Sequence, residues 1–359
     1  MAAYIVRRLI FMLITLFGII LLNFALVQFM PGGPVEQMVS KLSGKTGGGF
    51  GGGSDTSGSI SAGISNPSQA GQGLPPELIK ELEALYGFDK PLHERFILTV
   101  KQFATFQFGD SYYRDANVTT LIIERLPTTM ALGLTTLFFT YLISIPLGIR
   151  KAVSDGNRFD IWTSVAIIVG YAIPSFVLAV FLMVLFAGGN YLDWFPLQGL
   201  TSQNFEELSF FGKFADLAHH LALPVLSMLI GSFATITMLT KNAFIEEIGK
   251  QYVTTARAKG LKENRILYGH VFRNAMLVVV ANFPAAFVGA IFTGAILIEI
   301  IFGLNGMGLL AFEAAINRDF PLILGLIFIF GMVSLITKLL GDLLYVAIDP
   351  RIDFEARDV

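Results

Sequence analysis

The side chains that could carry out chemistry in this chain do not form a catalytic or metal-binding set. Ser43–Thr46 reads SGKT, which ends like a phosphate-binding loop, but the first glycine of that motif would have to stand at Val39. His219 and His220 are adjacent, so on a helix their side chains point about 100° apart and would share a metal ion poorly. Cysteine and the HExxH and GxSxG motifs are absent. The sequence therefore predicts no enzyme, no metal site and no cofactor held by this chain.

A few polar residues and prolines inside apolar stretches are candidates for a role in a pathway or a gate. Glu299 lies near the end of an apolar run, where a carboxylate is predicted either to make hydrogen bonds at the membrane interface or to contact a substrate. Lys338 and Asp342 are four residues apart, which predicts a structural ion pair on one helix face. Pro174 and Pro284 each remove a backbone donor and favour a kink, which would serve either helix packing or gating.

The polar segment with the most distinctive pattern is the basic stretch Tyr252–Asn274, which lies between two long apolar runs. Few helix-breaking residues occur over Phe244–Lys259, which includes the small residues Thr254, Thr255, Ala256 and Ala258, and Gly260 follows at a place where helices often end. A second short helix is expected over Leu261–Phe272. Two short helices meeting at a glycine would form a compact protrusion, with Ala256 on the face that enters a groove of a partner protein. The alternative is an ordinary positively charged loop on the cytoplasmic side.

The composition places these residues in a membrane protein. Of the 359 residues, 54% are hydrophobic and only 14% are charged, and the mean hydropathy is +0.66. Soluble domains carry about 25% charged residues. The formal net charge of −2 offers no basic surface for nucleic acid. We therefore expect a polytopic protein in a lipid bilayer, without a nucleic-acid partner.

Six apolar stretches reach the length of about 20 residues that a bilayer-spanning helix needs. They are continuous rather than alternating, and lipid leaves the backbone no donors or acceptors, so helices are expected. The first stretch is too long for the apolar part of a signal peptide, and no A-x-A-like cleavage site follows it, so it is interpreted as a retained helix. The expected spans are Leu9–Met30, Thr128–Ile149, Ile161–Ala187, Leu221–Thr240, Ala275–Phe302 and Leu322–Ala347.

Lysine and arginine predict the orientation of these spans. Loops 150–160 and 241–274 are rich in both residues, whereas loops 188–220 and 303–321 hold only Lys213 and Arg318. Cytoplasmic loops carry the excess of positive charge, so the two basic loops and both termini are expected in the cytoplasm.

The orientation leaves the long segment between the first two spans outside the cytoplasm. Its stretch 43–73 is rich in Gly and Ser and is interpreted as a flexible insertion, and a small ordered cap with an amphipathic helix over 77–87 is expected after it. The expected organisation is a cytoplasmic end and first span over 1–30, an outer loop over 31–126, a five-helix transport core over 127–347 with the cytoplasmic loop 241–274, and a cytoplasmic tail over 348–359.

The basic segment resembles the coupling loop of permease subunits in binding-protein-dependent ABC importers, in particular the dipeptide and oligopeptide permeases. In that loop a patch of small residues precedes a glycine, as Thr255 and Ala256 precede Gly260 here, with Thr254 in place of the family's usual Glu. Similar strings run along the whole chain: YIVRRL near the start, MPGGPV at 30–35, YGFDKPLHERF at 86–96, FGDS at 108–111, IPLGIRKA at 145–152 and IDPRID at 348–353. The lengthened outer loop, RKAVSDGNRFD and FGLNGMG resemble a subgroup that imports peptides and the peptide antibiotic microcin C.

The resemblance implies an all-α polytopic membrane protein with six transmembrane helices and the type I permease fold of ABC importers. It implies a non-catalytic subunit in the bacterial inner membrane that pairs with a second homologous permease and forms half of a peptide pathway. Two ATP-binding cassette subunits would bind ATP and Mg²⁺ below it, and a periplasmic peptide-binding protein would dock above it. The residues implied in coupling to the ATPase are Tyr252, Thr255, Ala256, Arg257, Lys259, Gly260 and Leu261, and those considered for the pathway or gate are Pro174, Pro284 and Glu299.

Two other classes of protein remain as alternatives. A secondary transporter of small polar solutes, driven by an ion gradient, would carry acidic residues near the middle of several spans and show internal repeats. Four of the expected spans hold no charge, and no clear repeat is visible. An intramembrane enzyme would need a nucleophile and base, or a metal set, within the spans, and the sequence shows none.

Overall fold

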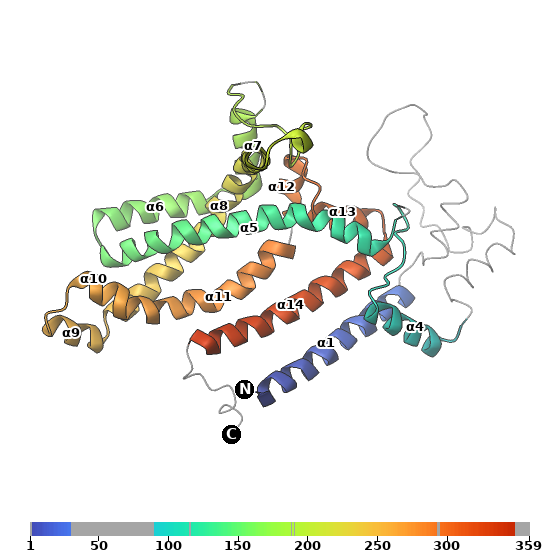
Figure 1. Ribbon diagram of the computed structural model, residues 1–359, viewed down its shortest axis with the longest axis horizontal. Helices are drawn as coiled ribbons and strands as arrows, with labels where there is room; N and C mark the ends of the chain where they lie inside the picture. Colours follow the sequence, from blue (N-terminus) through green and yellow to red (C-terminus); the bar gives the residue numbers. More distant parts are fainter. Residues whose placement is uncertain are drawn as a thin grey trace. The chain divides into compact units, whose positions relative to one another are not determined.

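The structure, a computed structural model, describes residues 2–29, 90–114, 116–187, 189, 191–292 and 295–348. Within these ranges the chain is helical, and its only β structure is an isolated bridge between Asp110 and Asn117, which confirms the predicted all-α fold. The helices, labelled in Figure 1, are α1 (Ala2–Phe29), α4 (Leu92–Ala104), α5 (Val118–Val153), α6 (Arg158–Ala172), α7 (Ser175–Phe186), α8 (Phe210–Ile248), α9 (Gln251–Ala258), α10 (Glu263–Ile266), α11 (Phe272–Phe292), α12 (Ile296–Ile301), α13 (Met307–Ile316) and α14 (Phe320–Ile348), with a 3-10 turn at Phe205–Glu207 and a π turn at Leu267–Val271.

Parts of the expected organisation lie outside the described residues. These are the Gly/Ser-rich stretch 43–73, the amphipathic helix expected over 77–87, and the tail from residue 349 onward. The helix that is described in the outer loop is α4, which begins directly after Pro91.

Among the described residues, five helical stretches are long and apolar enough to cross a membrane, and a bent pair of shorter helices brings the number to as many as six. The five stretches begin with α1, α5, α8, α10 and α14, and the pair is α6 with α7. Counted in this way, the helices agree with the six expected spans by length and composition, and the third span differs in form from the prediction.

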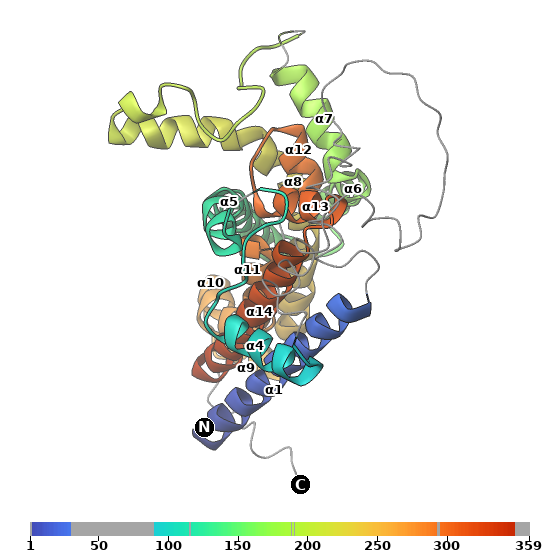
Figure 2. The same cartoon turned by 90° about the vertical axis from the view of Figure 1, so that its right-hand side faces the viewer.

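The third crossing is not the single helix expected over Ile161–Ala187. α6 ends at Ala172 and α7 starts at Ser175, and the two axes differ by 91°. The turn can be followed in Figures 1 and 2. Ile173 and Pro174 between them have extended ψ angles of 119° and 134°. Proline lacks the N–H that would continue the helix, and it keeps the preceding residue out of the helical region. The kink predicted at Pro174 is thus a complete break.

The chain divides into two compact units, each of which is described by itself: Met1–Ile10, Thr120–Glu313 and Ile329–Val359 form the first, and Phe11–Thr119 and Ala314–Phe328 form the second. In the first unit α8 is the central helix, because α6, α7 and α11 all pack against it. Its 39 residues give a length of about 58 Å at 1.5 Å per residue, whereas the hydrocarbon core of a bilayer is about 30 Å thick.

The second unit is held by aromatic side chains and one buried carboxylate. Phe103, Phe108 and Phe328 form a cluster whose ring centroids lie 5.2–5.8 Å apart. Asp319 is buried and accepts hydrogen bonds from the Ser111 hydroxyl and from the Tyr112 N–H, the latter at 3.2 Å. Edge-to-face aromatic packing and a satisfied carboxylate give this part of the outer loop an ordered core.

Candidate functional site

Gly260 ends the short helix α9 (Gln251–Ala258) as predicted. The second short helix expected over Leu261–Phe272 is not separate, because α10 has four residues and continues through the π turn at Leu267–Val271 into α11. Gly260 has a φ of +76°, which residues with a side chain rarely adopt. The Gly260 N–H donates to the carbonyl of Arg257 at 2.9 Å, and the Leu261 N–H donates to the carbonyl of Ala256 at 3.3 Å. These two bonds make a Schellman motif, which satisfies carbonyls that the helix end leaves free. The bend between α9 and α10 is therefore a defined turn.

Within the first unit, α9 is held against other helices by two of its apolar residues. Val253 and Ala256 are buried in a cluster with Ile149, Phe244 and Val271. The prediction that Ala256 faces a partner protein is therefore wrong. The small side chain of Ala256 lies in this cluster with side chains of α5, α8 and the π turn.

The outward face of α9 is made by Gln251, Thr254, Thr255 and Ala258, all of which are exposed. These residues are spaced three and four apart, so they lie on one face of the helix. Except for Gln251 their side chains are small, which leaves the backbone of α9 accessible to a groove in another protein. The face available to a partner therefore includes Thr255 but not the neighbouring Ala256, which was predicted to lie on it.

The basic residues in and after α9 differ in their contacts. Arg257 pairs with Glu263 through Nε and Nη2, at 2.8 and 3.2 Å, and so joins the end of α9 to the start of α10. This pair raises the pKa of Arg257, and because it is exposed it adds little to stability. Lys259 is exposed beside Gly260, and Leu261 is half-buried against the cluster that holds α9.

Tyr252 anchors the start of α9 to two other helices. Its hydroxyl donates to Glu247 Oε2 of α8 at 2.8 Å and accepts from Asn274 Nδ2 of α11 at 3.5 Å. Burial and the hydrogen bond to the Glu247 carboxylate raise the pKa of Tyr252. Lys250 pairs with the same carboxylate, so the loop between α8 and α9 is held at both ends.

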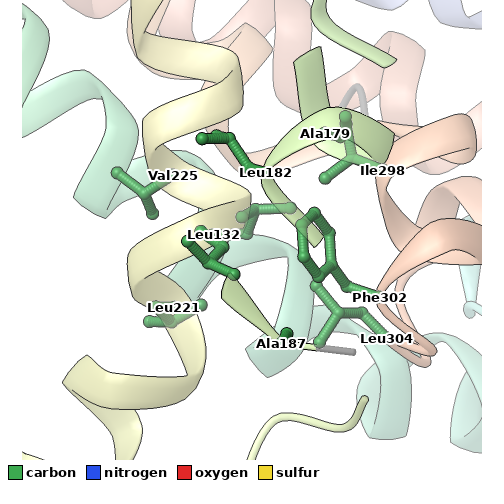
Figure 3. Packing of buried hydrophobic residues seen from close by; sticks show 10 residues of the cluster. Leu132, Ala179, Leu182, Ala187, Leu221, Val225, Ile298, Phe302 and Leu304 are labelled. Carbon is green, nitrogen blue, oxygen red and sulfur yellow. The ribbon is translucent and has the colours of Figure 1, made fainter. Parts of the chain in front are cut away.

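At the other end of α8, a second cluster packs α5, α7, α8 and α12 together (Figure 3). Leu132 of α5, Leu182 of α7, Leu221 of α8 and Phe302 after α12 belong to this cluster. The cluster includes α7, which follows the break at Pro174, so the proline places an apolar helix against α12. The contacts of α7 agree with the helix-packing interpretation of Pro174, and its role in a gate stays a prediction.

Glu299 is fully buried at this end and is surrounded by hydrogen-bond donors. Its carboxylate accepts from the Leu309 N–H at 2.7 Å and from the Thr129 hydroxyl at 3.3 Å, and the same hydroxyl accepts from the Met307 N–H at 2.7 Å. A Cβ on Gly306 would lie 2.5 Å from the Glu299 carboxyl, so the glycine lets the loop wrap this carboxylate. The hydrogen-bonding interpretation of Glu299 describes these contacts, which bind the start of α13 to α5 and α12.

Pro284 lies inside α11 and faces α14. A Cβ on Gly341 would come within 2.8 Å of the Pro284 ring. Beside this close contact lies a groove of about 610 Å³, whose lining includes Ala281, Ser334 and Lys338.

The ion pair predicted between Lys338 and Asp342 does not form. Asp342 accepts from the guanidinium of Arg8 and, at 2.9 Å, from the hydroxyl of Tyr4. The carboxylate has two donors from α1 within reach, and they bind α1 to α14 in the first unit.

No group of three or more metal-ligating side chains occurs in the part of the chain that the structure describes. His219 and His220 instead hold the loop before α8. His219 Nε2 lies 2.7 Å from the carbonyl of Trp194, and His220 contacts the Ser202 hydroxyl at 3.2 Å and the Gly199 carbonyl at 2.9 Å.

Residues 144–354 match the protein family described as the binding-protein-dependent transport system inner membrane component. This range includes α9, its Schellman turn and α14. The chain belongs to this family. A secondary transporter driven by an ion gradient is therefore not favoured.

Relatives of the permease cover its whole length. It is 53% identical to the peptidoglycan transport system permease protein YejB of Agrobacterium fabrum strain C58, with complete coverage of both chains. It is 50% identical to the inner membrane ABC transporter permease protein YejB of Escherichia coli O157:H7, over 99% of this chain and all of the relative. The oligopeptide permease OppB of Haemophilus influenzae is 33% identical over 80% of this chain and 90% of its own. The predicted resemblance is confirmed, both to the family and to the YejB subgroup.

Several residues that hold the permease's site together escaped sequence reasoning. Glu247 and Thr129 are examples, because each makes its bond to a residue on another helix. The interval of five between Glu247 and Tyr252 was a usable signal, since both flank the Gly249 that ends α8. The Thr129 hydroxyl bonds to Glu299 of α12 and to the Met307 N–H at the start of α13, residues 170 and 178 positions away, and no local sequence pattern predicts such distant pairs.

Proposed function

We propose that this permease forms half of the membrane pathway of an ATP-driven importer for peptides or peptide-like compounds, in the inner membrane of a bacterium. A second homologous permease supplies the other half. ATP-binding cassette subunits, which bind ATP and Mg²⁺, lie against α9 and α10, and a periplasmic peptide-binding protein delivers the substrate from the opposite side. Both termini are in the cytoplasm.

The observation that carries this proposal is how α9 packs: one side is buried and the other is exposed. One side of the helix is buried against α8 and α11 through Val253 and Ala256, and the other presents Thr254, Thr255 and Ala258 to the surroundings. A helix held in this way transmits a push on its exposed face to the helices behind it, as a subunit without its own ATP site requires. Tyr252, Arg257, Lys259, Gly260 and Leu261 shape or border this face.

The substrate class rests on the named relatives. One YejB is described as a peptidoglycan transport permease, and OppB as an oligopeptide transport permease. Peptides occur in both descriptions, since peptidoglycan contains peptide chains. We therefore place peptides, including those released from the cell wall, before other polar solutes.

Purification and transport assays test the proposal. The tagged chain, expressed in its native bacterium and extracted in mild detergent, is expected to retain a second permease and ATPase subunits. Proteoliposomes holding this complex should take up labelled peptide only when the binding protein is outside and ATP is inside. Uptake by the chain alone in response to an ion gradient, without ATP, would contradict the proposal.

A further inference from the structure

Lys151 at the end of α5 is an unusual residue, because it is a lysine with no exposed side-chain surface. Its Nζ donates to the Asp160 carbonyl at 2.9 Å, to the Thr163 hydroxyl at 2.8 Å and to the Ser164 hydroxyl at 2.7 Å. An ammonium group has three protons, so all of them are used. A buried, fully bonded lysine fixes the end of α5 to the first turns of α6 in one geometry.

Asp160 connects this lysine to a third helix. Its Oδ1 lies 2.9 Å from Lys151 Nζ, and its Oδ2 accepts from Lys241 of α8 at 2.7 Å and from the Gly156 N–H at 3.2 Å. Lys241 also pairs with Asp155 at 2.9 Å. Two cations and two carboxylates thus balance, and one carboxylate is shared by α5, α6 and α8. We refer to Lys151, Asp160 and Lys241 as the three-helix node.

The node lies directly beside the residues that hold α9. Ala152, which follows Lys151, and Phe244, one turn after Lys241, belong to the buried cluster that contains Val253 and Ala256 of α9. Movement of α9 therefore acts first on the segments of α5 and α8 that the node joins.

From the node, α6 leads to the break at Pro174, and α7 then enters the cluster of Figure 3 with Ile298 of α12 and with Phe302, which directly follows α12. α8 reaches the same cluster through Leu221 and Val225. The helices joined at the node thus continue into the packing around α12 and its buried Glu299.

We propose that Lys151, Asp160 and Lys241 are positioning residues that make the adjoining ends of α5, α6 and α8 move as one body with α9, so that displacement of the coupling helix reaches the cluster around α12. This inference rests on the proposed function. Buried ion pairs add little or nothing to stability compared with apolar packing. The hydrogen bonds are directional, however: those from Lys151 hold α5 to α6, and the one from Lys241 to Asp160 holds α8 to α6, so they favour one relative position of the three helices. Apolar contacts alone would let α6 slide along α8.

Peptide uptake per ATP hydrolysed, measured with the complete importer in proteoliposomes, tests the node. In the Asp160→Asn variant we expect this ratio to fall about tenfold, within the range that coupling free energies between sites usually span, while ATPase subunits remain bound. Lys241→Arg should keep the ratio, because a guanidinium can reach both Asp155 and Asp160. Asp342→Asn is the matched control. It also removes a carboxylate from an ion pair between helices, but the pair joins α1 to α14, so the ratio should not change.

A double variant, Asp160→Asn with Lys151→Met, removes the buried carboxylate together with the buried ammonium and so leaves no unpaired charge at the buried pair, while Lys241 keeps its ion pair with Asp155. It should assemble and show the same lowered ratio. A parental ratio in the double variant would overturn the inference, and so would failure of both Asp160 variants to assemble, since the node would then serve only the fold. If Asp160→Asn transports normally while variants on the exposed face of α9 lose their ATPase subunits, the inference fails and the proposed function stands.

Discussion

At Gly260 the backbone conformation, and not a lack of space, restricts which side chains are tolerated. A Cβ at this position meets no atom within 4 Å, yet the φ is +76°. A left-handed conformation costs residues with a side chain about 1–2 kcal/mol. We predict that Gly260→Val loosens the Schellman turn and lowers both peptide uptake and retention of ATPase subunits, measured by transport and by copurification.

The matched variant Gly260→Asn separates strain from side-chain size. Asparagine adopts the left-handed region more readily than valine, so this variant should retain more ATPase subunit. Equal behaviour of the two variants and the parental chain would show that the turn does not set the position of α10.

Ala256 and Thr255 are consecutive residues of α9 whose side chains point about 100° apart, one buried and one exposed, so they should respond differently to a bulky replacement. Ala256→Trp forces a large side chain into the buried cluster, and overpacking of this kind costs about 1–3 kcal/mol. We predict a lowered melting temperature for Ala256→Trp. Thr255→Trp should leave the melting temperature nearly unchanged and release the ATPase subunits. Size-exclusion chromatography of heated detergent extracts and subunit copurification measure the two effects. The reverse pattern would contradict the assigned faces.

The loop between α12 and α13 depends on the space left by a glycine. A Cβ on Gly306 would approach the Glu299 carboxyl to 2.5 Å, whereas one on Gly231 in α8 meets nothing within 4 Å. We predict that Gly306→Ala lowers stability by about 1–3 kcal/mol through overpacking, and that Gly231→Ala is neutral or stabilising. Thermal melts of the purified complex compare the two. Equal melting temperatures would mean that the loop adjusts without losing its hydrogen bonds to Glu299.

Elements were predictable wherever the determining signal was local. The end of α9 at Gly260 and the break at Pro174 follow from the backbone preferences of glycine and proline. The direction of Ala256 was not predictable, because it depends on where α8 lies. The partner of Asp342 escaped for the same reason: a spacing of four suggests Lys338, but Tyr4 and Arg8 from the other end of the chain reach the carboxylate first. The node escaped because Lys151 and Lys241 have the pattern of ordinary cations flanking a span.

For the whole molecule, apolar length predicted six crossings, and the helices extend beyond the predicted spans. α8 was expected over Leu221–Thr240 but runs from Phe210 to Ile248. The backbone hydrogen bonds of the helix continue into its more polar ends, where water can solvate the side chains. Hydropathy detects only the part of a helix that lies in lipid.

The length of α8 gives a test of orientation in this cysteine-free chain. Phe210 is 83% exposed at one end of α8, and Gly249 is exposed just beyond the other. We predict that an impermeant maleimide labels Phe210→Cys in intact spheroplasts and labels Gly249→Cys only after permeabilisation. Labelling of Gly249→Cys from outside would reverse the orientation and place the α9 face away from ATP.

The break at Pro174 also has a consequence for how the chain enters the membrane during synthesis. α6 has 15 residues and α7 has 12, about 22 and 18 Å at 1.5 Å per residue, and neither can cross a bilayer core of about 30 Å alone. Both pack on α8, which the ribosome makes later. The pair is therefore expected to remain accessible to proteases and chaperones until α8 has emerged, so that the third and fourth crossings are integrated together.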